Sequence, residues 1–244
     1  MSKLAVVVFC MIFPLLGFAG PKHSFSPKKD TAEEEVSNIK IELASVQNWE
    51  ELGSESDGIQ LYTGDVKGSS FEAFKGVMTV NASLKTLVQM FQDVEKMPDW
   101  MYSTVSVEIL EQISPVETIR YLINEIPYPF MKDRDLTVHT KIEQKIDKTV
   151  VIRMVKVADV KESVSGKVRI PFLDTTVKFI PKESGNVQVE YSGHIEPGGI
   201  IMGPVYNLMI KNTPLETLRD FRSLIKEYTS KDVSNIEYIQ NVDS

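Results

Sequence analysis

The sequence contains almost no cysteine. Cys10 is the single thiol among 244 residues, and it lies inside the apolar run from Leu4 to Phe18. Removal of that run would leave a chain without any thiol, which excludes thiol catalysis, disulfide bonds and cysteine metal sites. No other long apolar run exists.

Positive charge is also scarce. Lys and Arg number 27 against 34 Asp and Glu, so the formal net charge is −7. This balance disfavours binding to nucleic acid and offers no broad basic surface to an anionic membrane. We therefore expect a partner that is neutral, apolar or small.

Recognisable catalytic motifs are missing as well. The three histidines are His23, which precedes the first predicted helix, and His139 and His194, which fall on polar strand faces. We find no His-Glu-x-x-His, no phosphate-binding glycine loop with lysine, no nucleophile elbow and no metal cluster at ligand spacing. We predict no catalytic residue, no metal ion and no cofactor, and expect that the protein is not an enzyme.

The first 20 residues have the layout of a secretory signal. Lys3 precedes the apolar run, and small residues follow at Gly17, Ala19 and Gly20. We expect cleavage after Ala19 and a secreted or periplasmic protein; an uncleaved membrane anchor is the alternative. The predicted organisation is a signal peptide at 1–20, a flexible leader at 21–30, one domain at 31–229 and a fraying polar tail at 230–244.

Periodicity predicts a mixed α and β domain. Thr31 and Glu34 form a capping box for an amphipathic helix that Gly53 ends, and Ser83 caps a short second helix. Pro204 begins a long final helix that reaches about Tyr228, with a kink expected from Pro214. Alternating apolar residues predict strands at 59–65, 71–80, 105–113, 117–126, 134–146, 149–158, 167–181 and 187–196.

The strand from 134 shows the clearest alternation. Leu136 and Val138 share a face that we expect to be covered, whereas Thr137 and His139 share a face that we expect to be wet. Arg134 and Asp135 therefore point to opposite faces, so both cannot enter one site unless the corner is bulged.

Two segments that connect these elements contain proline or glycine at several positions. The stretch Ile126 to Leu136 is a corner stiffened by Pro127 and Pro129, and the stretch Glu196 to Pro204 is a glycine-rich turn that leads into the last helix. Such shaped corners favour a lipid-sized pocket over a catalytic motif.

Five local signatures occur in one order along the chain. They are Asp57-Gly58-Ile59-Gln60-Leu61-Tyr62, Asp99-Trp100, Pro129 through Arg134-Asp135, Glu196-Pro197-Gly198-Gly199 and Pro204. In this order the chain resembles the StAR-related lipid-transfer (START) domain family. The resemblance implies an α+β helix-grip fold, in which a curved antiparallel sheet wraps around a long C-terminal helix and encloses a hydrophobic tunnel for one lipid, for transfer or sensing.

The resemblance also implies a gate, and this sequence departs from the family in two places, one of them a small insertion, Met202-Gly203, before Pro204. The gate corresponds to Val160 to Gly166 and Pro197 to Gly203, with backbone freedom from Gly166, Gly198, Gly199 and Gly203. Members of the family that carry cholesterol often bury an arginine where Thr140 stands here. A sterol hydroxyl would lose that polar anchor.

Candidate site residues follow from face and position, although packed core is the alternative role for each apolar one. Arg134, Asp135 and Glu196 are structural groups or polar anchors, and Arg153 is a candidate head-group contact. The predicted tunnel lining comprises Phe74, Met78, Trp100, Tyr121, Ile123, Val138, Ile142, Arg153, Val155, Phe172, Tyr191, Ile201, Val205, Leu208 and Met209.

Two other functions remain open. The wider superfamily includes cyclase or aromatase enzymes, for which Tyr121, Arg153, Tyr191 and Glu196 would be the polar candidates. The other is an interaction module whose tunnel is closed by large side chains, and a tunnel far smaller than a lipid would favour it. We otherwise expect a monomer that binds a lipid or similar hydrophobic molecule, touches membranes transiently and binds no nucleic acid.

Overall fold

Apolar residues alternate along most strands and create one buried sheet face, against which the C-terminal helix packs. In the strand Asn186–Glu196, for example, Val187, Val189 and Tyr191 are each less than 5% exposed. The computed structural model describes residues 46–158, 160–162 and 164–241. The elements are β1 (Val46–Ser54), β2 (Gln60–Val66), β3 (Ala73–Asn81), α2 (Leu84–Gln92), η2 (Val94–Asp99), β4 (Thr104–Ser114), β5 (Glu117–Asn124), β6 (Arg134–Gln144), β7 (Val150–Lys156), β8 (Val168–Arg169), β9 (Phe172–Pro181), η3 (Glu183–Gly185), β10 (Asn186–Glu196) and α3 (Gly203–Tyr228).

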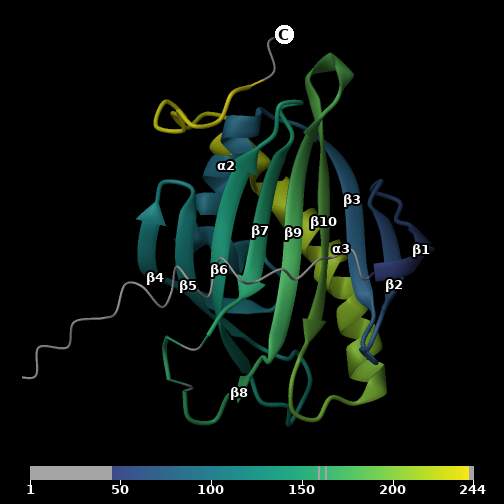
Figure 1. The fold of residues 1–244 in the computed structure, drawn as a ribbon. Helices are drawn as coiled ribbons and strands as arrows, with labels where there is room; N and C mark the ends of the chain where they lie inside the picture. The colour runs from purple at the N-terminus through teal and green to yellow at the C-terminus, as the bar shows by residue number, and fades with distance from the viewer. Residues whose placement is uncertain (1–45, 159, 163, 242–244) are drawn as a thin grey trace, which may run out of the picture.

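The strands form one curved sheet with the order β1-β2-β3-β10-β9-β7-β6-β5-β4, and α3 crosses behind it (Figure 1). Neighbours along this order pair antiparallel, while the short β8 pairs parallel with the start of β6. The predicted architecture, a curved antiparallel sheet that grips a long C-terminal helix, is confirmed. We call the sheet face toward α3 the inner face and the opposite one the outer face.

The second half of α3 is closely packed on β3. Leu218, Phe221 and Ile225 are at most 7% exposed. A Cβ atom added at Gly76 would lie 2.7 Å from Cδ1 of Leu218 and 2.9 Å from Cβ of Pro214. Glycine at this position therefore permits the close approach of helix and strand. The helix continues through Pro214 as one element.

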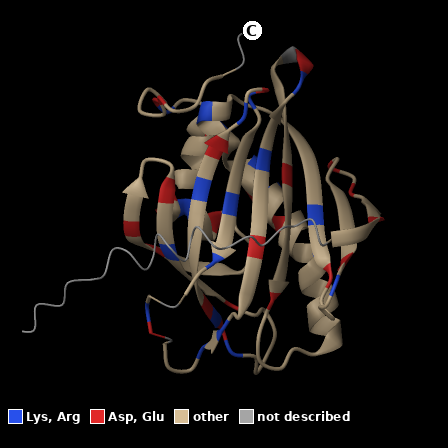
Figure 2. Cartoon of the chain, viewed as in Figure 1, with Lys and Arg blue, Asp and Glu red and all other residues tan. Residues whose placement is uncertain are grey.

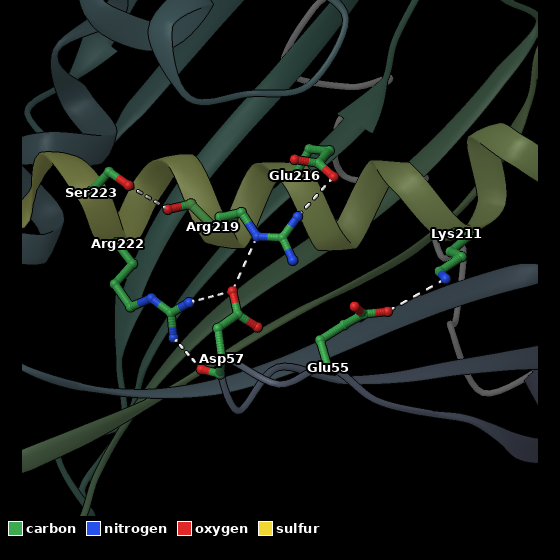
Figure 3. A network of polar contacts seen from close by, with 7 residues as sticks. All are labelled: Glu55, Asp57, Lys211, Glu216, Arg219, Arg222 and Ser223. Atoms are coloured by element: carbon green, nitrogen blue, oxygen red, sulfur yellow. Dashed lines mark hydrogen bonds and ion pairs between the residues drawn. The ribbon is translucent and has the colours of Figure 1, made fainter.

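Charged residues fasten the same half of α3 to the turn between β1 and β2 (Figure 3). One oxygen of Asp57 accepts from Arg219 Nε at 3.0 Å and from Arg222 Nη2 at 2.7 Å. Burial alone would raise the pKa of Asp57, but the bonds and charges of the two arginines lower it overall. A further ion pair, at 3.4 Å, joins Lys211 in the first half of α3 to Glu55 of the same turn.

The first predicted helix is wrong where the structure describes it. Residues 31–45 lie outside the described residues, but Val46–Ser54 forms strand β1. Its pairing with β2 shifts register between Gln47 and Glu50, and a Cβ at Gly64 would approach both Val46 and Trp49. Extra residues in a bulged strand thus put side chains three apart on one face, which mimics helical spacing.

The C-terminal tail is packed, so the fraying predicted for it is wrong over the described part. Ile236 and Ile239 are only 3% and 2% exposed within the core. Gln144 Nε2 donates to the carbonyl of Gln240 at 2.8 Å, and the backbone N–H of Gln240 donates back to Gln144 at 2.8 Å. Sparse apolar residues in a polar segment were sufficient to anchor it.

Two strand predictions also need correction. The strand predicted at 167–181 is split into β8 and β9 around Pro171, which has no N–H to donate. The outer face of β6 is wet only in its second half: Thr137 is 0% and His139 8% exposed, whereas the side chains of Lys141 and Glu143 are 45% and 64% exposed.

Charges of both signs are spread over the sheet and its loops (Figure 2). Among the residues that the structure describes, no helix has the length and hydropathy needed to cross a bilayer.

We expect Gly76→Val to lower the free energy of unfolding by about 2 kcal/mol, because the new side chain would overpack against Leu218 and Pro214. Urea unfolding would measure this. Gly203→Ala is the matched control, since a Cβ there meets nothing within 4 Å. Equal stability of the two variants would contradict the close contact at Gly76.

Candidate functional site

A cavity lies between the inner face of the sheet and α3. Its volume is about 70 Å³, and a second space of about 30 Å³ shares four wall residues with it, Ile195, Pro197, Met209 and Thr213. Sites for drug-sized ligands commonly measure about 300–1,000 Å³, so a whole lipid would require the walls to move. The other wall residues of the larger cavity are Met101, Tyr102, Ser103, Leu122, Asn124, Glu125, Ile126, Arg134, Val138, Met154, Ile170, Leu173, Thr175 and Tyr191.

Methionines form an adaptable part of this wall. Met101 comes from the loop after η2, Met154 from β7 and Met209 from α3. The unbranched methionine side chain has three rotatable bonds and refills irregular spaces. This part of the wall can therefore change shape by side-chain rotation.

Four of the predicted lining residues lie at these cavities. Val138, Tyr191 and Met209 line the larger one, and Phe74 and Met209 line the smaller one. Their contact with a ligand stays a prediction. Three others, Met78, Trp100 and Ile142, are buried in the hydrophobic core without reaching either cavity.

Five predicted lining residues lie on the outer face, so the prediction of an interior position is wrong for them. In β5 the cavity residues Leu122 and Asn124 are even-numbered, so their odd-numbered neighbours point outward. These strands carry apolar residues on both faces, so hydrophobicity alone did not show which alternate residues face the interior. The five residues are Tyr121, Ile123, Arg153, Val155 and Phe172.

The remaining candidates lie around the start of α3. Val205 is 2% exposed but does not line a cavity, and Ile201 is half-buried in the loop before the helix. Leu208 is 45% exposed, so its predicted place in the tunnel wall is wrong. Its neighbour Met209 takes the cavity side.

Arg134 fastens two loops together at one end of the cavity. Its Nε donates to the carbonyl of Pro197 and its Nη2 to that of Gly198, both at 3.1 Å, and Nη1 bonds the carbonyl of Lys132. The residue is 2% exposed, and burial lowers its pKa. Arg134 therefore joins the proline-rich corner to the turn before α3, and we call this arrangement the Arg134 clamp.

The glycines of the predicted gate have different surroundings. Gly198 and Gly199 have φ angles of +64° and +60°, a region that other residues rarely adopt. A Cβ at Gly198 would also lie 2.8 Å from the carbonyl oxygen of Arg169. Gly166 has φ of +87°, whereas Gly203 is simply the first residue of α3. Glycine is thus required by the turn itself, and gating stays a prediction.

Asp135, on the outer face, binds the segment that precedes β9. Its side chain is 0% exposed and accepts from Arg169 Nε and Nη2 at 3.0 Å, from the Tyr121 hydroxyl at 2.8 Å and from the Val164 N–H at 3.3 Å. Burial alone would raise the pKa of Asp135, but these donors lower it overall. Burial and the bond to Asp135 raise the pKa of Tyr121 to about 12. Asp135 is a structural anchor.

The family follows from comparison with known proteins. The model of the START domain matches residues 29–231, which is most of the chain. The chain belongs to the START domain family. An uncharacterized protein of Pseudomonas aeruginosa, PA1579, is 28% identical over 180 residues, which cover 74% of this chain and 88% of that protein.

Solved START structures have the same architecture. The STAR-related lipid transfer protein of Xanthomonas axonopodis (fragment 25–204) superposes with a TM-score of 0.67 at 28% identity, covering 74% of this chain and 99% of that one. Human StAR-related lipid transfer protein 5 gives a TM-score of 0.67 at 12% identity and covers 82% of this chain and 95% of its own. The human protein supports the fold alone.

Two polar candidates are placed away from the cavity of this START domain. Arg153 binds Asp174 through two contacts, Nε to Oδ1 at 3.1 Å and Nη2 to Oδ2 at 2.6 Å, on the outer face. The predicted head-group contact of Arg153 is therefore wrong. Glu196 lies 3.8 Å from His194 Nε2 and is 39% exposed, so it does not enter the cavity either.

Sequence reasoning missed one charged residue of the interior, Arg120. It is 2% exposed and shares the inner face of β5 with Leu122 and Asn124. The signal that could have found it is the alternation of side chains along a strand. If Asn124 faces inward, Arg120 lies on the same face, because the two residues are an even number of positions apart.

We expect Asp135→Asn to lower the free energy of unfolding by about 3 kcal/mol near neutral pH, because it leaves the Arg169 charge without its buried partner. The folded-state pKa of Asp135 is lowered, so its contribution is complete above the unfolded pKa of about 4 and is lost as the pH falls through the folded value. The difference from wild type should therefore shrink below about pH 4.

Chemical unfolding at pH 7, 5, 4 and 3 would measure this difference. Asp133→Asn is the matched control, since that side chain is 41% exposed beside Lys167 and its loss should cost under about 1 kcal/mol. A constant gap between Asp135→Asn and wild type at every pH would contradict the assignment.

Proposed function

We propose that this START domain binds one lipid or similar hydrophobic molecule between its sheet and α3 and transfers it between membranes. The observation that carries the proposal is a mostly apolar cavity enclosed by the sheet, Met209 of α3 and the Arg134 clamp. The similar Xanthomonas protein is itself described as a lipid transfer protein.

The chemistry of the wall is sufficient for non-covalent binding. Each methylene removed from water contributes about 0.8 kcal/mol, so an acyl chain can be held without a catalytic residue. Leu122, Val138 and Leu173 supply apolar surface, and methionines supply adaptability.

We further propose that the protein acts outside the cytoplasm and docks on a membrane beside the cavity. The signal peptide predicted at residues 1–20 supports the first point but lies outside the described residues. The second point rests on apolar side chains in the two loops joined by the Arg134 clamp, where Phe130 is fully exposed and Ile200 87% exposed. Such side chains suit insertion into a lipid interface.

One observation favours a second function, that of an interaction module with a closed interior. The two spaces of about 70 and 30 Å³ are far smaller than a lipid. A carrier must open this interior, whereas an interaction module would keep it closed.

Purification of the mature chain from its own host compartment, followed by native mass spectrometry and organic extraction, would distinguish the two functions. A lipid bound at one copy per chain would establish the carrier or sensor. A protein without bound lipid that also rejects a broad panel of lipids would contradict the carrier and favour the closed module or an enzyme with a polar substrate.

We expect Met209→Trp to weaken binding of a fluorescent fatty acid by at least about ten-fold, because the indole fills the space that the acyl chain needs. Leu208→Trp is the matched control, since Leu208 is 45% exposed on the adjacent position of α3. Circular dichroism would confirm that both variants fold. Equal affinities would mean that the ligand lies elsewhere.

We expect Phe130→Asp to slow lipid transfer between vesicles about ten-fold while leaving affinity unchanged, because a charge opposes insertion into the interface. Ile146→Asp is the control, since Ile146 is 101% exposed beyond the opposite end of β6. Equal slowing by both substitutions would contradict docking through the clamped loops.

A further inference from the structure

Arg120 lies in the interior with few partners. Its Nε donates to Thr118 Oγ1 at 2.9 Å, its Nη1 lies 3.4 Å from the sulfur of Met97, and its guanidinium carbon is 5.5 Å from the centre of the Phe91 ring. At 2% exposure the guanidinium group has lost nearly all contact with water.

No carboxylate among the described residues forms an ion pair with Arg120. Burial is the one cause that lowers its pKa, to about 10, with no opposing effect from an acidic neighbour. Arginine keeps its charge even so, and an unpaired buried charge is strongly unfavourable. Arg134, by contrast, has three carbonyl oxygens as acceptors.

A row of inner-face residues joins Arg120 to the cavity. Thr118 of β5 pairs with Thr140 of β6, Thr140 pairs with Met154 of β7, and Met154 pairs with Thr175 of β9. Directly opposed residues on neighbouring strands have Cβ atoms about 5 Å apart, so the row is continuous. Met154 and Thr175 line the cavity, and Thr118 binds Arg120.

Unsatisfied polar atoms mark both this row and its surroundings. The hydroxyl oxygens of Thr140 and Thr175 are buried without a hydrogen-bond partner among the described residues. The same holds for Nε1 of Trp100, whose ring packs on the Phe91 ring beneath Arg120. Buried polar groups are nearly always satisfied in native proteins, so these hydroxyl and indole groups are available to donate to an acceptor that enters the interior.

We infer that Arg120 and the hydroxyl group of Thr140, on the neighbouring strand, bind the anionic head group, a carboxylate or a phosphate, of the hydrophobic ligand, and that Thr175 lies farther along the row toward the cavity. The inference rests on the proposed function and specifies the class of its ligand. Rotation of Met154 would open the cavity along the row, and the acyl chain would then extend back toward Met209 and the Arg134 clamp. A carboxylate or phosphate supplies the acceptors that Arg120 and the hydroxyl groups lack, and charge-assisted bonds to arginine are the strongest of this kind.

The test compares matched lipid pairs that differ in charge but share one acyl chain. The mature protein is titrated with oleate against methyl oleate, and with oleoyl lysophosphatidic acid against monoolein, by displacement of a fluorescent reporter. The first pair reports on a carboxylate and the second on a phosphate. The variants are Arg120→Met, which keeps the length of the side chain without its charge, and Arg120→Lys, which keeps the charge without the planar fork. Lys226→Met removes a charge at an exposed position and is the control.

We expect wild type and Lys226→Met to prefer the anionic member of at least one pair by about ten-fold or more. Arg120→Met should bind both members of that pair equally while keeping its affinity for the neutral one, and Arg120→Lys should keep part of the preference. A merely structural role for Arg120 would change thermal stability and leave the preference intact.

Equal binding of both members of each pair by wild type would overturn the inference and leave the proposed function standing. An unchanged preference in Arg120→Met would also overturn it. If Arg120→Met fails to fold, Thr140→Val decides the question in its place, since it removes an unpaired hydroxyl from the row and should reduce the preference several-fold. Binding of no member of either pair would overturn the proposed function and this inference with it.

Discussion

The close approach of α3 to β3 at Gly76 sets the geometry of the whole interior. Without a Cβ atom at this position, Pro214 and Leu218 can lie directly on the strand. One turn further along the helix, Arg219 and Arg222 bind Asp57 in the turn between β1 and β2 (Figure 3). A helix fixed by packing on one side and by charge on another has little freedom to slide along the sheet.

The anchoring of α3 is uneven along its length. From Pro214 onward the helix buries seven residues, whereas Val205 is the one buried residue before that point. The first half lies over the cavity and carries Met209, and the loop before it is held by the Arg134 clamp. Opening the interior along the first half of α3 would therefore sacrifice much less apolar burial than separating the second half.

Much of the fold could be predicted from the sequence because period-two alternation and caps are local signals. Ser83 caps α2 as expected, its hydroxyl accepting from the Thr86 N–H at 3.1 Å, and Pro204 lies in the first turn of α3. The strand β1 could not be predicted, because Val46 and Trp49 are three positions apart, a spacing typical of a helix. The bulge in β1 allows both side chains to lie on one face of a strand. The buried tail was missed because two isoleucines in a polar segment carry no periodic signal.

The site was predicted less well than the fold, because the sequence did not show which alternate residues of each strand face inward. Strands such as β5 and β7 are apolar on both faces, so Tyr121 and Val155 could not be told from inward residues by hydrophobicity. The polar residues could have shown which residues face inward. The Arg134-Asp135 pair was expected to split between faces, and the structure shows Arg134 at the cavity and Asp135 outside. Extending that parity from Arg134 across the sheet assigns Asn124 and then Arg120 to the inside.

The interior contains polar groups that an apolar ligand alone would not require. Apolar walls alone would hold an acyl chain, and a methionine or leucine at position 120 would spare the fold a buried charge. The protein instead retains Arg120, and among the described residues the Thr140 hydroxyl on the neighbouring strand and Nε1 of Trp100 are buried without a hydrogen-bond partner. A buried polar group without a partner costs free energy, and one anionic head group would supply acceptors to Arg120 and Thr140 together. The free energy gained when these buried polar groups obtain partners would contribute to the affinity for the ligand. The small volume of the cavity fits this proposal if ligand entry rotates the methionines of the wall out of the way.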